Sequence, residues 1–198
     1  MAQMKTPGVY IIEKNAFPNS VVEVATAIPA FIGHTQFARD GNKDLTGIPF
    51  RISSMAEFHS FFGFAPTLRF GIRPEDSESE DTTNDINVLF PDGSCQLTLP
   101  KTFYALYYNM LLFYANGGGP CYIVSIGDYE HDFKSIDFTN ALLALKKEQE
   151  PTLVVVPEAV YMEEGDCYKV QTAALMHCGN DMKNRFAILD VFNGYKDE

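Results

Sequence analysis

The chain has 198 residues, of which 46% are hydrophobic, a composition typical of a folded protein with a substantial core. The formal net charge of −11 argues against a nucleic-acid backbone as partner, because phosphate contacts need clustered lysine and arginine. No apolar run approaches the roughly twenty residues of a membrane-spanning helix, and the first residues lack the apolar segment of a secretory signal. We therefore expect no direct membrane insertion, and a cytoplasmic protein unless a larger particle carries it out.

Residues 1–20 are predicted to form an extended arm and linker. A turn signal is followed by a short stretch with strand propensity, and residues 14–19 then interrupt regular structure. A strand cut off in this way has too few partners within its own chain to be stable alone. We expect it to pair with a sheet edge, either of its own domain or of a neighbouring subunit. The arm residues are Thr6, Pro7, Gly8, Val9, Tyr10, Ile11, Ile12 and Glu13.

Residues 21–198 are predicted to form one α/β domain. Its first part contains strand-forming residues at 21–26, 28–33 and 50–52, and Pro29 indicates a bend or a sheet edge in the second of these. The residues between the second and third strands are polar and contain glycine, which predicts a loop.

Ser54 and Glu57 have the spacing of a capping box, which predicts a short helix that Gly63 ends. The next feature is an acidic loop at 73–86, in which the segment RPEDSESEDTTND carries six acidic residues and one basic residue. We interpret it as a solvated loop, because such a composition buries little apolar surface. A calcium site is the alternative, although the spacing lacks the Asp-x-Asp-x-Asp-Gly pattern. Short strands around a Pro-Asp-Gly turn are predicted at 86–99.

A longer helix is predicted to begin at Pro100, because apolar residues then recur at three- and four-residue spacing. Asn116 and Gly117 end it, and a buried strand follows at 121–126. The three glycines at 117–119 therefore come after a helix and before a strand. A phosphate-binding loop needs the opposite order, so we interpret these glycines as a turn.

The second half of the chain alternates between helices and strands. Asp137 and Asp166 are predicted to cap two further helices, and strands are predicted at 153–156 and 186–191. Gly179 or Asn180 is expected to interrupt or end the second of these helices. This alternation is typical of crossover units. It predicts an α/β fold with a mixed, largely parallel sheet flanked by helices.

Candidate chemistry is sparse. Asp128 and His131 follow a predicted strand, and Asp190 ends another, which are positions where α/β enzymes place functional groups. We find no nucleophile–base pair, no metal-binding spacing and no cofactor motif, and we interpret the adjacent His177 and Cys178 as buried packing. None of the four cysteines forms a C-x-x-C pair; they are Cys95, Cys121, Cys167 and Cys178. A small α/β enzyme or ligand-binding domain, with its site at the carboxyl ends of the strands, is one hypothesis.

Three passages together resemble the contractile tail sheath family of phages and of extracellular contractile injection systems. The first is Thr6–Tyr10 followed by the segment TAIPAFIG at 26–33, and the second is the helix SMAEF with the Phe-Gly pair that closes it. The third couples FYANGG and CYIV, at 113–118 and 121–124, to RFAILD at 185–190. The resemblance covers the N-terminal portion of the family pattern, whose further core and C-terminal arm are absent from these 198 residues.

The resemblance implies a structural subunit and not an enzyme. Sheath subunits stack as six-fold rings around an inner tube and contract, which drives the tube through a target membrane. The implied partners are copies of this chain, the inner tube protein, and baseplate and cap proteins, with no cofactor and no metal. Val9–Glu13 would then be the strand donated to a neighbouring subunit, and residues 15–20 the flexible linker behind it. The protein would be cytoplasmic during assembly and part of a particle that is released from the cell.

Overall fold

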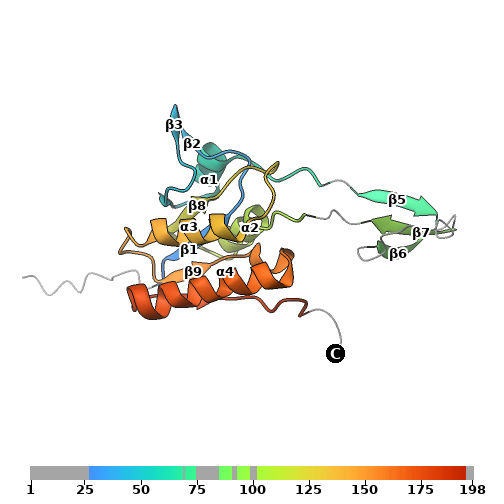
Figure 1. The fold of residues 1–198 in the computed structure, drawn as a ribbon. Coiled ribbons are helices and arrows are strands. Elements are labelled where there is room, and N and C mark those ends of the chain that lie inside the picture. Colours follow the sequence, from blue (N-terminus) through green and yellow to red (C-terminus); the bar gives the residue numbers. More distant parts are fainter. Residues whose placement is uncertain (1–26, 69, 75–84, 91–92, 99–101, 195–198) are drawn as a thin grey trace, which may run out of the picture.

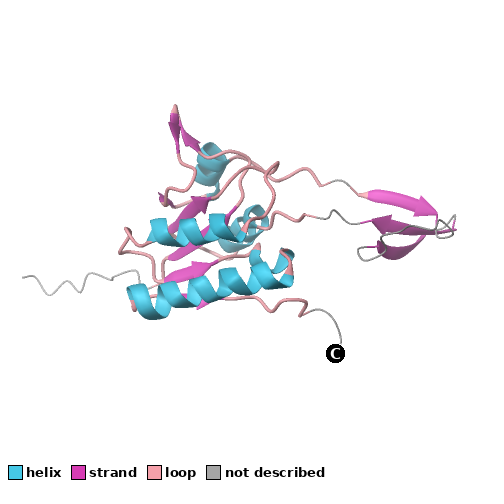
Figure 2. Cartoon of the chain, in the orientation of Figure 1, coloured by secondary structure: helices cyan, strands magenta, loops and turns pink. Residues whose placement is uncertain are grey.

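The computed structural model describes residues 27–68, 70–74, 85–90, 93–98 and 102–194 (Figure 1). The predicted arm, the predicted strand at 21–26 and residues 75–84 of the acidic loop lie outside the described residues. The fold is α/β, with a mixed, mostly parallel five-stranded sheet flanked by helices (Figure 2), so the predicted fold class is confirmed. No helix in the described ranges is both long enough and apolar enough to span a bilayer.

The five-stranded sheet has the order β10-β9-β1-β8-β4. The first four of these strands are parallel, and β4 pairs with β8 in the antiparallel direction. The prediction of a bend or edge at Pro29 is wrong, because Pro29 is the first residue of β1, the central strand; a proline is tolerated at that position. The strands are β1 (Pro29–Gly33), β4 (Phe50–Ile52), β8 (Cys121–Ser125), β9 (Leu153–Val155) and β10 (Phe186–Ile188).

Helices cover both faces of this sheet. Alternate residues of β1 point to opposite faces, so Ala30 and Ile32 belong to one buried cluster and Phe31 to the other. The first cluster includes residues of α3 and α4, and the second includes residues of α1 and α2. The helices are α1 (Met55–Phe62), α2 (Leu106–Ala115), α3 (Ser135–Leu145) and α4 (Glu164–Met176).

The helix boundaries confirm one predicted cap and correct two. The Ser54 hydroxyl accepts a hydrogen bond from the Glu57 amide, as the capping box predicts. Asp137 and Asp166 do not cap their helices; both lie in the first turn, where a negative charge still interacts favourably with the helix dipole. Lys134 and Glu163 occupy the cap positions.

Three other boundaries also differ from the prediction. Helix α2 begins at Leu106 and not near Pro100, and residues 102–105 precede it as irregular chain. Neither Gly179 nor Asn180 ends the last helix, because α4 continues into a π-helical segment, η2 (His177–Met182), that stops at Lys183 in a left-handed conformation. Strand β10 stops at Ile188, so Asp190 does not end a strand. Gly117 does end α2, with a φ of 81°.

A second sheet stands away from the α/β body (Figure 1). It is antiparallel with the order β5-β7-β6, and its strands are β5 (Gly71–Pro74), β6 (Asp85–Phe90) and β7 (Gly93–Thr98). The sequence predicts strand pieces at 86–99 but does not predict β5 or a separate sheet. The smaller elements are the hairpin β2 (Arg39–Asp40) and β3 (Lys43–Asp44), and the short helix η1 (Ala159–Tyr161).

Arg185 ties the end of α3 to the π-helical segment. Its buried guanidinium donates from Nη1 to the Leu145 carbonyl at 3.0 Å and from Nη2 to the Glu148 carbonyl. Nη1 also lies 2.9 Å from Nε2 of buried His177. Because arginine only donates, Nε2 must accept, so His177 is neutral with its proton on Nδ1. Burial and the adjacent guanidinium lower the pKa of His177 to about 4.

The lowered pKa of His177 predicts a loss of stability in mild acid. In the unfolded chain histidine binds a proton near its ordinary pKa of about 6.5, whereas folded His177 stays neutral down to about pH 4. The free energy of unfolding should therefore fall as the pH drops from about 6.5 to about 4, with a slope approaching about 1.4 kcal/mol per pH unit for this group. Urea unfolding across this range should show a shallower slope for His177→Gln, whose amide oxygen still accepts from Arg185.

Thr172→Gln, on the exposed side of α4, is the control, because it changes no titratable group and should keep the wild-type slope. Equal slopes for wild type and His177→Gln would show that this histidine is not held neutral by folding.

Candidate functional site at the carboxyl edge of the sheet

The carboxyl ends of β1, β8 and β9 meet at one edge of the sheet, because these strands are parallel and adjacent. Residues 34–38 follow β1, residues 126–131 follow β8, and residues 156–158 follow β9. Strand β1 has a parallel partner on each side, β9 and β8. The carboxyl end of such a strand is a common place for α/β folds to bind ligands. This edge is therefore the place to look for a functional site.

His34 and Glu158 form a buried pair at this edge. Nδ1 of His34 lies 2.7 Å from Oε2 of Glu158, and the same oxygen accepts the His34 backbone amide at 3.0 Å. Oε1 accepts the amide of Leu106, the first residue of α2, at 3.3 Å. A Cβ at Gly33 would lie 3.0 Å from both Glu158 and Leu106, so a side chain there would press on both groups.

Aromatic rings enclose the pair. The imidazole of His34 stacks on Phe133 at 4.8 Å between centroids and meets Tyr104 edge-on at 5.2 Å. Burial, followed by the negative charge of Glu158, raises the pKa of Tyr104. The carboxylate of Glu158 thus occupies the start of α2, which is where a helix would otherwise offer its free amides to an anionic ligand.

Sequence reasoning missed this pair. His34 directly follows the buried strand β1, and Glu158 comes shortly after β9. A polar residue just after a buried strand was the one pattern in the sequence that could have marked each of them as a candidate site residue. However, the two residues are 124 positions apart, and nothing in the sequence alone predicts that they meet.

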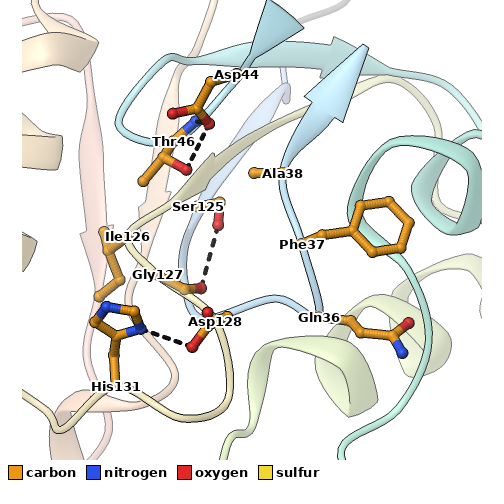
Figure 3. Close-up of a pocket in the computed structure, with 10 residues that line it drawn as sticks. All are labelled: Gln36, Phe37, Ala38, Asp44, Thr46, Ser125, Ile126, Gly127, Asp128 and His131. Atoms are coloured by element: carbon orange, nitrogen blue, oxygen red, sulfur yellow. Dashed lines mark hydrogen bonds and ion pairs between the residues drawn. The ribbon is translucent and has the colours of Figure 1, made fainter. Parts of the chain in front are cut away.

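A cavity of about 380 Å³ lies beside the pair, between the segments that follow β1, β3 and β8 (Figure 3). Asp128 and His131 face each other on its wall, and Oδ1 of Asp128 lies 2.6 Å from Nδ1 of His131. The residues that line it are Gln36, Phe37, Ala38, Asp44, Thr46, Ser125, Ile126, Gly127, Asp128 and His131.

Two carboxylates give the cavity a negative character. Oδ1 of Asp128 accepts from His131 and from the Glu130 amide, and these bonds lower the pKa of the Asp128 carboxyl, with the His131 bond contributing most. Oδ1 of Asp44 accepts from the amide and the hydroxyl of Thr46, which lowers the pKa of that carboxyl in the same way. Both side chains are therefore ionised at neutral pH.

The structure unites two of the three residues of the enzyme hypothesis. Asp128 and His131 line the cavity together, whereas Asp190 follows β10 at the outer edge of the sheet and is not part of the lining. The hydroxyl of Ser125, a potential nucleophile on the cavity wall, is 2.6 Å from the Thr35 hydroxyl and donates to the Gly127 carbonyl at 3.4 Å, so its partners are groups other than His131. Within the described ranges, no set of three or more histidine, cysteine, aspartate or glutamate side chains is placed to hold a metal ion.

The fold and this edge define a mixed α/β domain whose central strand ends at its own buried His–Glu pair. A scan against models of known protein families finds no match, and a search of curated proteins finds no significant match either.

Glu158→Gln should destabilise the fold strongly although it preserves the shape of the side chain. The new amide group has only one acceptor oxygen, so it would direct a donor at the amide of His34 or of Leu106. Leaving such buried groups unpaired costs about 2–4 kcal/mol. Chemical denaturation measures this loss, and Glu163→Gln, at the exposed cap of α4, should change stability by less than about 0.5 kcal/mol. A similarly small effect at Glu158 would contradict its role as an anchor.

Proposed function

We propose that this chain is a structural subunit of a contractile tail sheath. It assembles as stacked six-fold rings around an inner tube and contracts to drive the tube through a target membrane. Its partners are further copies of itself, the inner tube protein, and baseplate and cap proteins. Assembly takes place in the cytoplasm, and the finished phage-tail-like particle is released from the cell.

The observation that carries a structural role is the buried His34–Glu158 pair. It lies at the sheet edge where enzymes of this architecture bind their ligands, and Glu158 uses the start of α2 as an internal anchor. Polar groups in this position serve the cohesion of the fold. The motif order supports the sheath family in particular, because the matching passages supply the central strand β1, the helices α1 and α2, and the strands β8 and β10.

Assembly through strand donation fits the open edges of the sheet. Among the described residues, β4 and β10 each pair with a neighbour on one side only. Phe186 in β10 is 72% exposed. Such an edge accepts an extended segment through backbone hydrogen bonds, and in this proposal Val9–Glu13 of a neighbouring subunit supplies the segment. The energy of contraction lies in contacts between subunits, and no nucleotide is consumed.

Deleting residues 1–19 should leave a folded subunit that no longer polymerises with full-length partners. Deleting only residues 1–5 is the matched control, since it keeps Thr6–Glu13 and should preserve assembly. Negative-stain electron microscopy of the mixtures reports tubes or their absence, and circular dichroism reports folding. Tubes of normal length and abundance with the longer deletion would contradict the proposed arm.

The cavity favours a second candidate, a small α/β enzyme or ligand-binding domain that uses Asp128 and His131. This function is supported by the location of the cavity at the carboxyl edge of β1 and β8 and by the hydrogen bond between the two side chains. It predicts a dispersed protein under conditions in which the sheath hypothesis predicts helical tubes. The same microscopy therefore distinguishes the two functions.

A further inference from the structure

The direction in which the β5–β7 sheet projects depends on the two chain segments that leave the body. The outgoing connector precedes β5 and is described at residues 63–68 and 70, and the return connector precedes α2 and is described at residues 102–105 (Figure 1). Two contrasting arrangements are possible in principle: a sheet on free tethers, or a sheet held at a defined angle. The contacts that the described connector residues make with the body bear on this choice.

The outgoing connector is bound to the body at its first residues. Gly63 has a φ of 86°, and a Cβ at this position would lie 2.5 Å from Oε1 of Gln36, so the chain turns there against the body. The amide of Phe64 donates to Oε1 of Gln36 at 2.9 Å, and its carbonyl accepts from the Tyr129 hydroxyl at 2.8 Å. The ring of Phe64 stacks on His59 of α1 at 4.6 Å. The amide, the carbonyl and the ring of Phe64 therefore all contact the body.

The return connector is bound by the same loop. The Tyr104 hydroxyl donates to the His131 carbonyl at 3.0 Å, and the Tyr104 ring lies 5.1 Å from that of Tyr129. Phe103 packs against Tyr108 of α2 and against Tyr161 of η1. Tyr129 thus contacts both connectors, one through its hydroxyl and the other through its ring.

We propose that the loop of residues 128–131 is a clasp that holds both connectors and sets the direction of the β5–β7 sheet. The loop follows β8, so its base is anchored in the central sheet. Burial raises the pKa of the Tyr129 hydroxyl well above its ordinary value, so this donor keeps its proton. Asp128 and His131 of the same loop line the cavity, which connects the cavity wall mechanically to the projecting sheet. The inference stands independently of the proposed sheath function.

Spin labels on the sheet and on the body test the clasp by pulsed electron–electron distance measurement. Cys95 in β7 takes one label, since the other three cysteines are buried, and Thr172→Cys on the exposed side of α4 takes the second. The double variant Tyr104→Phe, Tyr129→Phe removes both hydroxyl bonds and keeps the rings. We expect a narrow distance distribution with the wild-type tyrosines and a distribution at least about twofold wider in the double variant.

Tyr122→Phe is the matched control. It removes a comparable hydroxyl bond, to Glu150 at 2.7 Å, from a strand residue outside the clasp, and it should leave the width unchanged. Gln36→Met, at an exposed position, provides a second test through loss of the acceptor for the Phe64 amide, and should also widen the distribution. Circular dichroism of each variant confirms that the body is folded. The proposal is overturned if the wild-type distribution is already as wide as that of the double variant, or if the double variant stays narrow.

Discussion

Three segments that are far apart in the sequence depend on the carboxylate of Glu158. It binds the imidazole and the amide of His34 after β1, and the first amide of α2, while its own position follows β9. A buried carboxylate is tolerated only when its oxygens are bonded, so the strand ends and the helix start must keep their relative positions. Gly33 is part of the same constraint, because a Cβ there would lie 3.0 Å from side-chain atoms of both Glu158 and Leu106. This anchor therefore holds together the end of β1, the start of α2 and the segment after β9.

Beside this anchor, the edge has a filled part and an open part. On the side of β9, the space is filled by Glu158, His34 and the rings of Phe133 and Tyr104. On the side of β8, the chain leaves an accessible cavity with two carboxylates on its wall. The loop after β8 therefore lies between the cavity and the two connectors. One of its sides faces the cavity, and the other contacts both connectors of the projecting sheet.

The α/β body combines a buried core with open sheet edges. The α/β body has apolar clusters on both faces of its central sheet, with Phe58, Phe138 and Ile123 fully buried. The body also leaves sheet edges open at β4 and β10 among the described residues. In the proposed sheath, such open edges would accept strands from neighbouring subunits, and these backbone-paired segments would keep their partners while the bodies rotate.

The sequence by itself determined the fold class, because the alternation of apolar strands and amphipathic helices is encoded locally. It also determined the capping box at Ser54 and the glycine stop after α2, since both depend on residues within one turn. The sequence did not determine where α2 begins, because the apolar spacing from Pro100 onward fits a helix that starts earlier than Leu106. The tertiary structure alone decided the pairing of His34 with Glu158 and the central position of β1. It also decided the separation of Asp190 from the cavity and the contacts of Tyr129 with Phe64 and Tyr104. Each depends on contacts between residues distant in the chain, and no local pattern specifies which distant partner a buried polar or aromatic group will meet.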